Sequence, residues 1–188
     1  MKNEIEKSAA LFIAVLGIFA LVIAVDTLTG SAIVQVANFT VGVDTFLACV
    51  WSSSSLNISF GTDLSPGVAF YNASDNYGVG NATGYNVTVD QISNINVNVT
   101  VKGEPLISGT NSIGIGNVTW QSNVSDANGS NLVQGGSIPL TSSFNVVNPV
   151  ASALAPAGVV HFRVWMSVPG GQVAGSYAGN YTMQCVQE

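Results

Sequence analysis

Residues 94–102, NINVNVTVK, decide the fold of this chain because apolar and polar side chains alternate along them without a break. Ile95, Val97, Val99 and Val101 fall on one side of an extended strand, and asparagine or threonine falls on the other. A period of two with one apolar face and one polar face predicts a half-buried strand of an antiparallel sheet.

The same pattern extends outward from this stretch in both directions. Residues 84–90, GYNVTVD, alternate in the same way, and residues 45–51, TFLACVW, form a denser run typical of a strand buried on both faces. Two long strands are predicted near the end of the chain. The first places Val160, Phe162, Val164, Met166 and Val168 on one face, and the second does the same with Tyr177, Tyr181, Met183 and Cys185.

Turn signals separate these runs, and no helical pattern follows the N-terminal region. The sequence therefore predicts an all-β fold, a single jelly-roll-like β-sandwich over residues 31–188, preceded by a hydrophobic N-terminal helix.

The N-terminal helix is predicted from residues 9–25, AALFIAVLGIFALVIAV, which contain no charged side chain. Such a run directs export, so residues 1–30 are interpreted as a leader and the rest as an extracellular or cell-surface domain. Three interpretations remain open: a cleaved signal peptide, a transmembrane anchor, or a type IV pilin-like helix cut between Ser8 and Ala9. The membrane is thus an expected partner, either during export or through this helix.

The composition excludes several classes of function. Only 7% of residues are charged, the formal net charge is −6, and the whole chain has four lysines and arginines. So few basic residues do not build a phosphate-binding surface, so nucleic acid is not an expected partner. Solubility must come from small polar side chains or from attached sugar.

Cys49 and Cys185 are the two cysteines of the chain. In an exported protein an even pair predicts a disulfide, and the alternative is two buried thiols. With one histidine and no CxxC pattern, the sequence predicts neither a metal site nor a cofactor.

No catalytic constellation is recognisable, and the chain is not expected to be an enzyme. His161 lies inside a predicted strand, and no GxSxG or HExxH motif accompanies it. We interpret it as a partly exposed strand residue.

The motif that exceeds its chance frequency is Asn-x-Ser/Thr, the acceptor of N-linked glycans. Composition alone predicts roughly three such triplets, whereas the chain contains ten. A chance match in a chain rich in small polar residues is the alternative. The predicted glycosylation sites are Asn38, Asn57, Asn72, Asn81, Asn86, Asn98, Asn117, Asn123, Asn128 and Asn180.

Three segments together resemble a known family: LNISFGTDLSPG at 56–67, GYNVTVDQISNINVNVTVKG at 84–103, and VPGGQVAGSYAGNYTMQ at 168–184. They look like the exported matrix-fibre proteins of the TasA and camelysin type and their archaeal relatives, the bundling pilins. The cysteine pair and the glycan acceptors depart from the bacterial pattern.

The resemblance implies an extracellular filament, a pilus or biofilm fibre, built by donor-strand complementation. In this arrangement a strand of one subunit completes the sheet of the next, which gives a head-to-tail homopolymer. Residues 31–43 are the expected donor, with Ala32, Val34, Val36, Phe39 and Val41 as its apolar positions. The alternative is a type IV pilin-like subunit or a membrane-anchored surface or adhesion domain.

Overall fold

The computed structural model describes residues 42–188, of which Asp44–Glu188 form one compact unit. The predicted leader, its helix and the five apolar donor-strand positions lie outside the described residues. Within residues 42–188 no helix is long and apolar enough to cross a membrane. The helical elements there are four three-residue 3-10 turns, η1 (Ser54–Leu56), η2 (Val79–Asn81), η3 (Ile115–Asn117) and η4 (Gln134–Gly136).

The larger sheet, sheet A, has six strands, all paired antiparallel. Along its main path they are β1 (Cys49–Trp51), β3 (Asn86–Val89), β10 (Val159–Met166), β7 (Val118–Asn123) and β8 (Ile138–Pro139). The short strand β2 (Tyr71–Asn72) pairs with the end of β10.

The smaller sheet, sheet B, has three antiparallel strands in the order β11 (Tyr181–Gln187), β4 (Val97–Gly103) and β9 (Ala151–Leu154). A separate hairpin joins β5 (Leu106–Ser108) to β6 (Asn111–Ile113). The all-β prediction is therefore confirmed for the described part of the chain.

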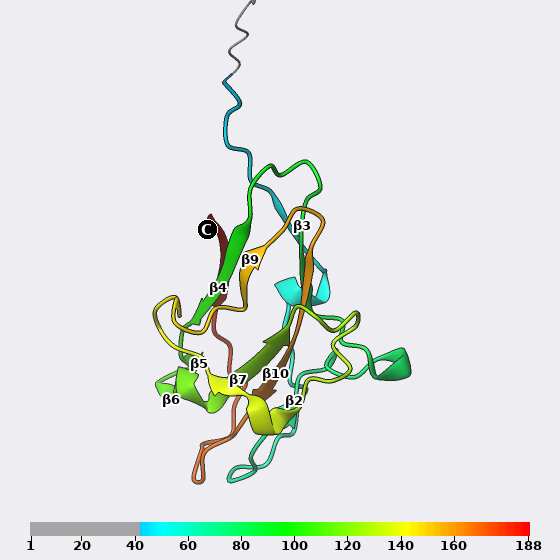
Figure 1. The fold of residues 1–188 in the computed structure, drawn as a ribbon. Coiled ribbons are helices and arrows are strands. Elements are labelled where there is room, and N and C mark those ends of the chain that lie inside the picture. The colour runs from blue at the N-terminus through cyan, green and yellow to red at the C-terminus, as the bar shows by residue number, and fades with distance from the viewer. Residues whose placement is uncertain (1–41) are drawn as a thin grey trace, which may run out of the picture. The chain divides into compact units, whose positions relative to one another are not determined.

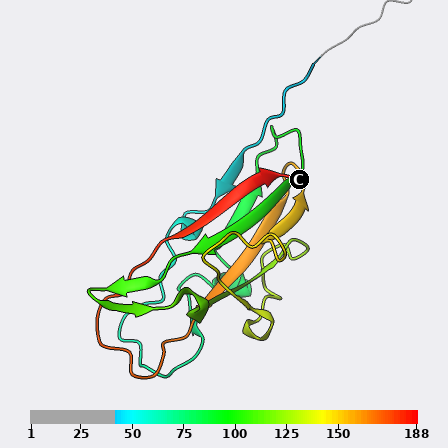
Figure 2. The ribbon, with the colours of Figure 1, turned by 90° about the vertical axis from the view of Figure 1, so that its left-hand side faces the viewer.

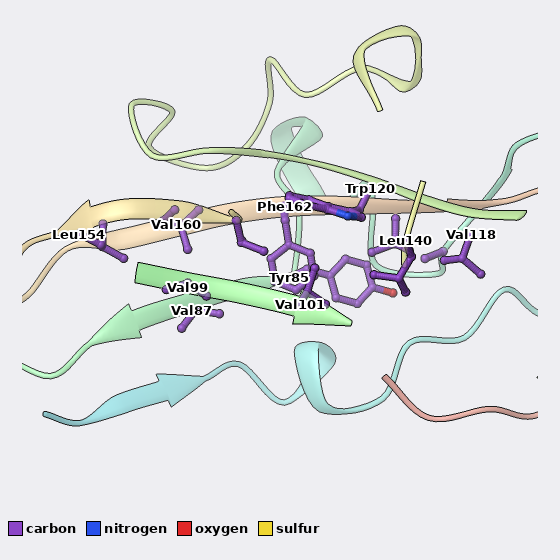
Figure 3. Close-up of a cluster of buried hydrophobic side chains, with 14 of the residues drawn as sticks. Tyr85, Val87, Val99, Val101, Val118, Trp120, Leu140, Leu154, Val160 and Phe162 are labelled. Atoms are coloured by element: carbon purple, nitrogen blue, oxygen red, sulfur yellow. The ribbon is translucent and has the colours of Figure 1, made fainter. Parts of the chain in front are cut away.

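One hydrophobic core lies between the two sheets, as the side chains in Figure 3 show. Sheet B contributes Val97, Val99 and Val101, the face predicted from the alternation of β4, and all three are buried. Sheet A contributes Val160, Phe162, Val164 and Met166 from β10, which confirms the predicted inner face of that strand.

Two predictions at the strand level are wrong. Residues 45–51 were predicted to form a strand buried on both faces, but β1 has three residues, lies at the edge of sheet A, and leaves Val50 56% exposed. Cys49 and Trp51 pack against the core, so Val50 between them points to the opposite face of sheet A and stays in solvent. Tyr177 lies in the loop before β11 rather than on its inner face, since the strand begins at Tyr181.

The outer face of sheet A is covered by loops rather than open to water. Arg163 and Trp165 point away from the core, yet each is only 1% exposed. Asn76, from the loop after β2, takes the place of a strand here: its amide donates to Val164 O at 2.6 Å and its carbonyl oxygen accepts from Val164 N at 2.9 Å.

The unit has two distinct ends, which Figures 1 and 2 both show. The chain enters at Asp44, whose carbonyl accepts a hydrogen bond from Asn94 Nδ2 at 2.8 Å, and Glu188 N bonds to Asn96 O nearby. The loops of residues 57–66 and 172–180 lie at the opposite end. β4, with seven residues, separates the two ends by roughly 20 Å.

Candidate functional site

The unit has a groove of about 760 Å³ at the end opposite Asp44, lined by apolar core side chains together with polar ones such as Asp63, Glu104 and Asn180. Its rim consists of the loops of residues 57–66 and 172–180. Its deeper wall is made of core side chains from sheet A, namely Val118, Trp120, Phe162, Val164 and Met166. The groove therefore continues the core, and the interior of the two-layer unit is incompletely filled at this end.

The groove lies beside a strand edge that no described strand covers. β11 pairs with β4 along one edge through seven aligned residue pairs, from Tyr181–Gly103 to Gln187–Val97. On its other side it has no strand partner among residues 42–188. An uncovered strand edge offers a row of backbone donors and acceptors that can bind another strand.

A disulfide closes the seam between the two sheets at the far end of β11. Cys49 of β1 is bonded to Cys185 of β11, with their Cα atoms 6.6 Å apart, which confirms the predicted pairing. In Figure 2, β1 (cyan) lies beside β11 (red). Disulfides persist in oxidising compartments, so this bond favours a setting outside the cytosol.

A smaller cavity of about 230 Å³ lies in the same seam, between Trp51 and Leu56 on one side and Tyr181 and Met183 on the other. Tyr181 and Met183 also line the main groove. The two cavities therefore adjoin at Tyr181 and Met183, near the beginning of β11.

Tyr181 lines both the groove and the smaller cavity. Its hydroxyl is buried and has no hydrogen-bond partner among residues 42–188. Burial raises the pKa of Tyr181 to about 12, and the nearby phenol of Tyr85 adds to the shift. The sequence indicated only that Tyr181 faces inward, because an unpaired hydroxyl depends on what surrounds it in three dimensions.

The rim loops of the groove are held in place by tyrosine hydroxyls. Tyr71 accepts from Ser65 N at 2.8 Å in the first loop, and Tyr177 accepts from Gln172 Nε2 at 2.7 Å and donates to Val173 O in the second. Gly67 has φ of +80°, a conformation that glycine adopts without strain, and Gly67 N bonds to Val168 O.

The nine described glycan acceptors are spread over the unit, and none is buried. Asn57, Asn72, Asn81, Asn128 and Asn180 are exposed, whereas Asn86, Asn98, Asn117 and Asn123 are half-buried. Asn38 lies outside the described residues. Asn86 and Asn123 are aligned on either side of His161 across three neighbouring strands of sheet A. Exposed asparagines are compatible with glycosylation, which stays a prediction.

His161, the histidine of the described part, has no acidic residue opposite it in the strand ladder. His161 is half-buried, its Nδ1 has no partner among these residues, and asparagines rather than acids face it across the ladder. No group of three or more histidine, cysteine or acidic residues within 42–188 is arranged to hold a metal ion.

Comparison with known proteins adds no relative: no protein-family model, no curated protein and no solved structure matches the chain. The functional argument therefore rests on the groove and the strand edge beside it.

Proposed function

We propose that the chain is a structural subunit of an extracellular filament, a pilus or biofilm matrix fibre, that polymerises by donor-strand complementation. Residues 31–43 of one copy insert into the groove of the next copy and pair with the uncovered edge of β11. The added strand completes sheet B and gives the subunit its jelly-roll-like form. N-linked glycans coat the outside, and the homopolymer is built head to tail.

The observation that carries this proposal is the groove of about 760 Å³ that opens directly onto core side chains. An apolar interior open to water is unfavourable unless something covers it. The uncovered edge of β11 lies next to the groove. A segment that binds there needs free backbone hydrogen-bonding groups and apolar side chains on one face.

Residues 31–43, SAIVQVANFTVGV, have these properties. Ala32, Val34 and Val36 share one face of a strand, and Phe39 and Val41 continue it after a change of phase. The segment has no charged residue, so its insertion into the groove buries no charge of its own.

The position of the chain entry favours insertion into a neighbour. The donor segment is joined to Asp44, which is held at the end of the unit opposite the groove rim. A neighbour's donor that enters at the rim runs antiparallel to β11. A donor that folds back along its own subunit runs parallel to β11. Antiparallel pairing is the more stable of the two, and every strand pair of the described sheets is antiparallel.

The test is to place a charge on the donor. Val34→Asp or Val36→Asp should abolish filaments in electron micrographs and leave a folded monomer, because a buried unpaired carboxylate is costly. Val79→Asp is the matched control, since Val79 is 99% exposed on η2 and away from the groove. Deletion of residues 31–38 should act like Val34→Asp. Filaments that form unchanged from the deleted protein would contradict the proposal.

The apolar run at residues 9–25 supports a second candidate, a type IV pilin-like subunit or a membrane-anchored surface domain. The mass of the mature N-terminal peptide distinguishes the two candidates. Cleavage near Ser31 supports the donor-strand filament, cleavage near Ala9 supports the pilin-like subunit, and an intact Met1 supports the anchor.

A further inference from the structure

We infer that successive copies of the chain also contact each other outside the inserted strand: exposed apolar residues at the chain entry of one copy pack against exposed apolar residues beside the groove rim of the next. This inference rests on the proposed function and adds a second surface to the same interface. Phe46 and Ile92 form the entry patch, and Phe70, Ile107 and Val173 form the rim patch. The partner of each patch is a second copy of the chain.

The entry patch lies where the chain enters the unit. Phe46 N donates to Asn94 Oδ1 at 2.8 Å, and Asn94 N donates to Phe46 O, so the first residues of the unit lie beside the loop of residues 90–96. Phe46 and Ile92 belong to these two neighbouring segments, and both side chains are exposed. The entry end of the unit therefore presents apolar surface to solvent next to Asp44.

Two residues of the rim patch belong to the loop of residues 172–180 and the strand beside it. Val173 is exposed and lines the groove. Ile107 of β5 is exposed as well, and it exchanges backbone hydrogen bonds in both directions with Ala178 of the same loop. Apolar side chains therefore extend from the groove onto the outer surface of its rim.

Phe70, the third residue of the rim patch, is exposed and has an unfavourable backbone conformation. Its φ is +63°, which is rare for a bulky aromatic residue. Its N–H donates to Ser167 Oγ at 3.2 Å, next to the groove-lining Met166. Residues in such conformations collect at sites that bind other molecules, so an exposed ring held in this way favours a contact with another copy.

The length of the chain between donor and unit brings the two patches together. The apolar positions of the donor end at Val41, and three residues later the carbonyl of Asp44 is fixed by Asn94. An extended chain spans at most about 3.5 Å per residue, so about 10 Å separates an inserted donor from the unit that supplies it. The entry end of one copy is therefore held against the rim of the next, and contact between the patches removes apolar surface from water.

A charge on either patch tests the inference. Filaments of Ile92→Asp or of Val173→Lys should lose subunits in denaturant roughly tenfold faster than wild-type filaments, because a charge replaces an apolar contact. Both positions are exposed in the unit, so the same changes should leave the denaturation midpoint of the assembly-blocked Val36→Asp monomer unchanged.

The combination of the two changes tests whether the patches face each other. Opposite charges attract over about 10 Å at moderate salt, so Ile92→Asp with Val173→Lys should dissociate more slowly than either single variant. If a single variant forms no filaments, the return of filaments in the combination gives the same answer. Damage to the fold at either position would not produce such a recovery.

Val133 is the matched control position. It is 58% exposed, close to the 62% of Ile92 and the 54% of Val173, and its N–H bonds to Gln121 Oε1 on the outer side of sheet A. Filaments of Val133→Asp and Val133→Lys should dissociate at the wild-type rate.

Two results would overturn the inference. If filaments of Ile92→Asp and Val173→Lys dissociate at the wild-type rate, the ends of successive copies make no such contact, and donor-strand assembly itself still stands. If the combination dissociates as fast as the single variants, the two patches do not face each other. Failure of the proposed function gives a different result, namely filaments that persist when Val34→Asp is introduced.

Discussion

At the scale of single residues, Arg163 shows how a charge is accommodated without a carboxylate. It is 1% exposed, and its guanidinium donates to the carbonyls of Asn81 and Leu132 and stacks on the ring of Tyr77 at 4.1 Å. These contacts tie two loops onto the outer face of sheet A. Arginine suits this role because its planar group donates in several directions at once.

The two core tyrosines predict instability in alkali. Burial raises the pKa of Tyr85 and raises that of Tyr181 to about 12, so both hydroxyls stay neutral in the folded state at a pH where the unfolded chain ionises. The contribution of Tyr181 to stability is therefore complete below about pH 10 and is lost as the pH rises towards 12, and Tyr85 acts in the same direction. Denaturant midpoints of the Val36→Asp monomer, measured from pH 8 to 12, should be level at first and then fall.

Tyr181→Phe supplies the control for this titration. Because the variant removes one of the two shifted groups, its midpoint should fall less steeply above pH 10 than that of the parent monomer. An equally steep fall in both proteins would mean that Tyr181 ionises as readily in the folded state as in the unfolded chain.

At the scale of elements, the disulfide joins the edges of two different sheets. The seam between β1 and β11 contains a cavity rather than a strand ladder, so Cys49–Cys185 is the covalent link across a poorly filled region. The bond connects the first strand of the unit to the last, with a sequence separation of 136.

Removal of this bond should be costly. In the chain-entropy account, a loop of this length stabilises the folded state by about 5 kcal/mol. The double variant Cys49→Ser, Cys185→Ser, measured by urea denaturation of the assembly-blocked monomer, should lose free energy of unfolding of this order.

Reductant provides the internal control for the disulfide. It should lower the midpoint of the protein that retains both cysteines and leave the double serine variant unaffected. Equal midpoints for the oxidised and reduced forms of the cysteine protein would contradict the stabilising role of the bond.

At the scale of the whole molecule, the surface has few charged groups to keep the protein soluble. Residues 42–188 contain seven acidic and two basic side chains, and one of the basic ones, Arg163, is buried. Sixteen large apolar residues of the same range are exposed, including Val79, Val147 and Val146. A surface this poor in charge needs other hydrophilic groups to stay soluble.

Glycans are the expected source of that hydration, and several of the ten acceptors should be occupied. Asn72 is exposed and makes no side-chain hydrogen bond to a described residue, whereas Asn117 is half-buried and donates from Nδ2 to Gly114 O. Glycopeptide mapping of the secreted protein should therefore find higher occupancy at Asn72 than at Asn117. Ten unmodified asparagines would refute this account of solubility.

The sequence by itself determined the class of the fold and the inner faces of β4 and β10, and it favoured a disulfide between its two cysteines. Alternation in β4 and β10 identified which side chains are buried, because a strand presents successive residues to opposite faces. The two cysteines had one possible pairing within the chain. Strand alternation is a local property, and the pairing of two cysteines follows from their number, so both can be read directly from the sequence.

The tertiary structure alone decided where the core is incomplete. The groove, the uncovered edge of β11 and the unpaired Tyr181 hydroxyl depend on which strands are neighbours and on which edges remain without one. The burial of Arg163 likewise depends on loops from residues 73–84 and 126–137 that fold over sheet A. Such contacts join segments far apart in the sequence, and the periodicity of a single strand carries no information about them.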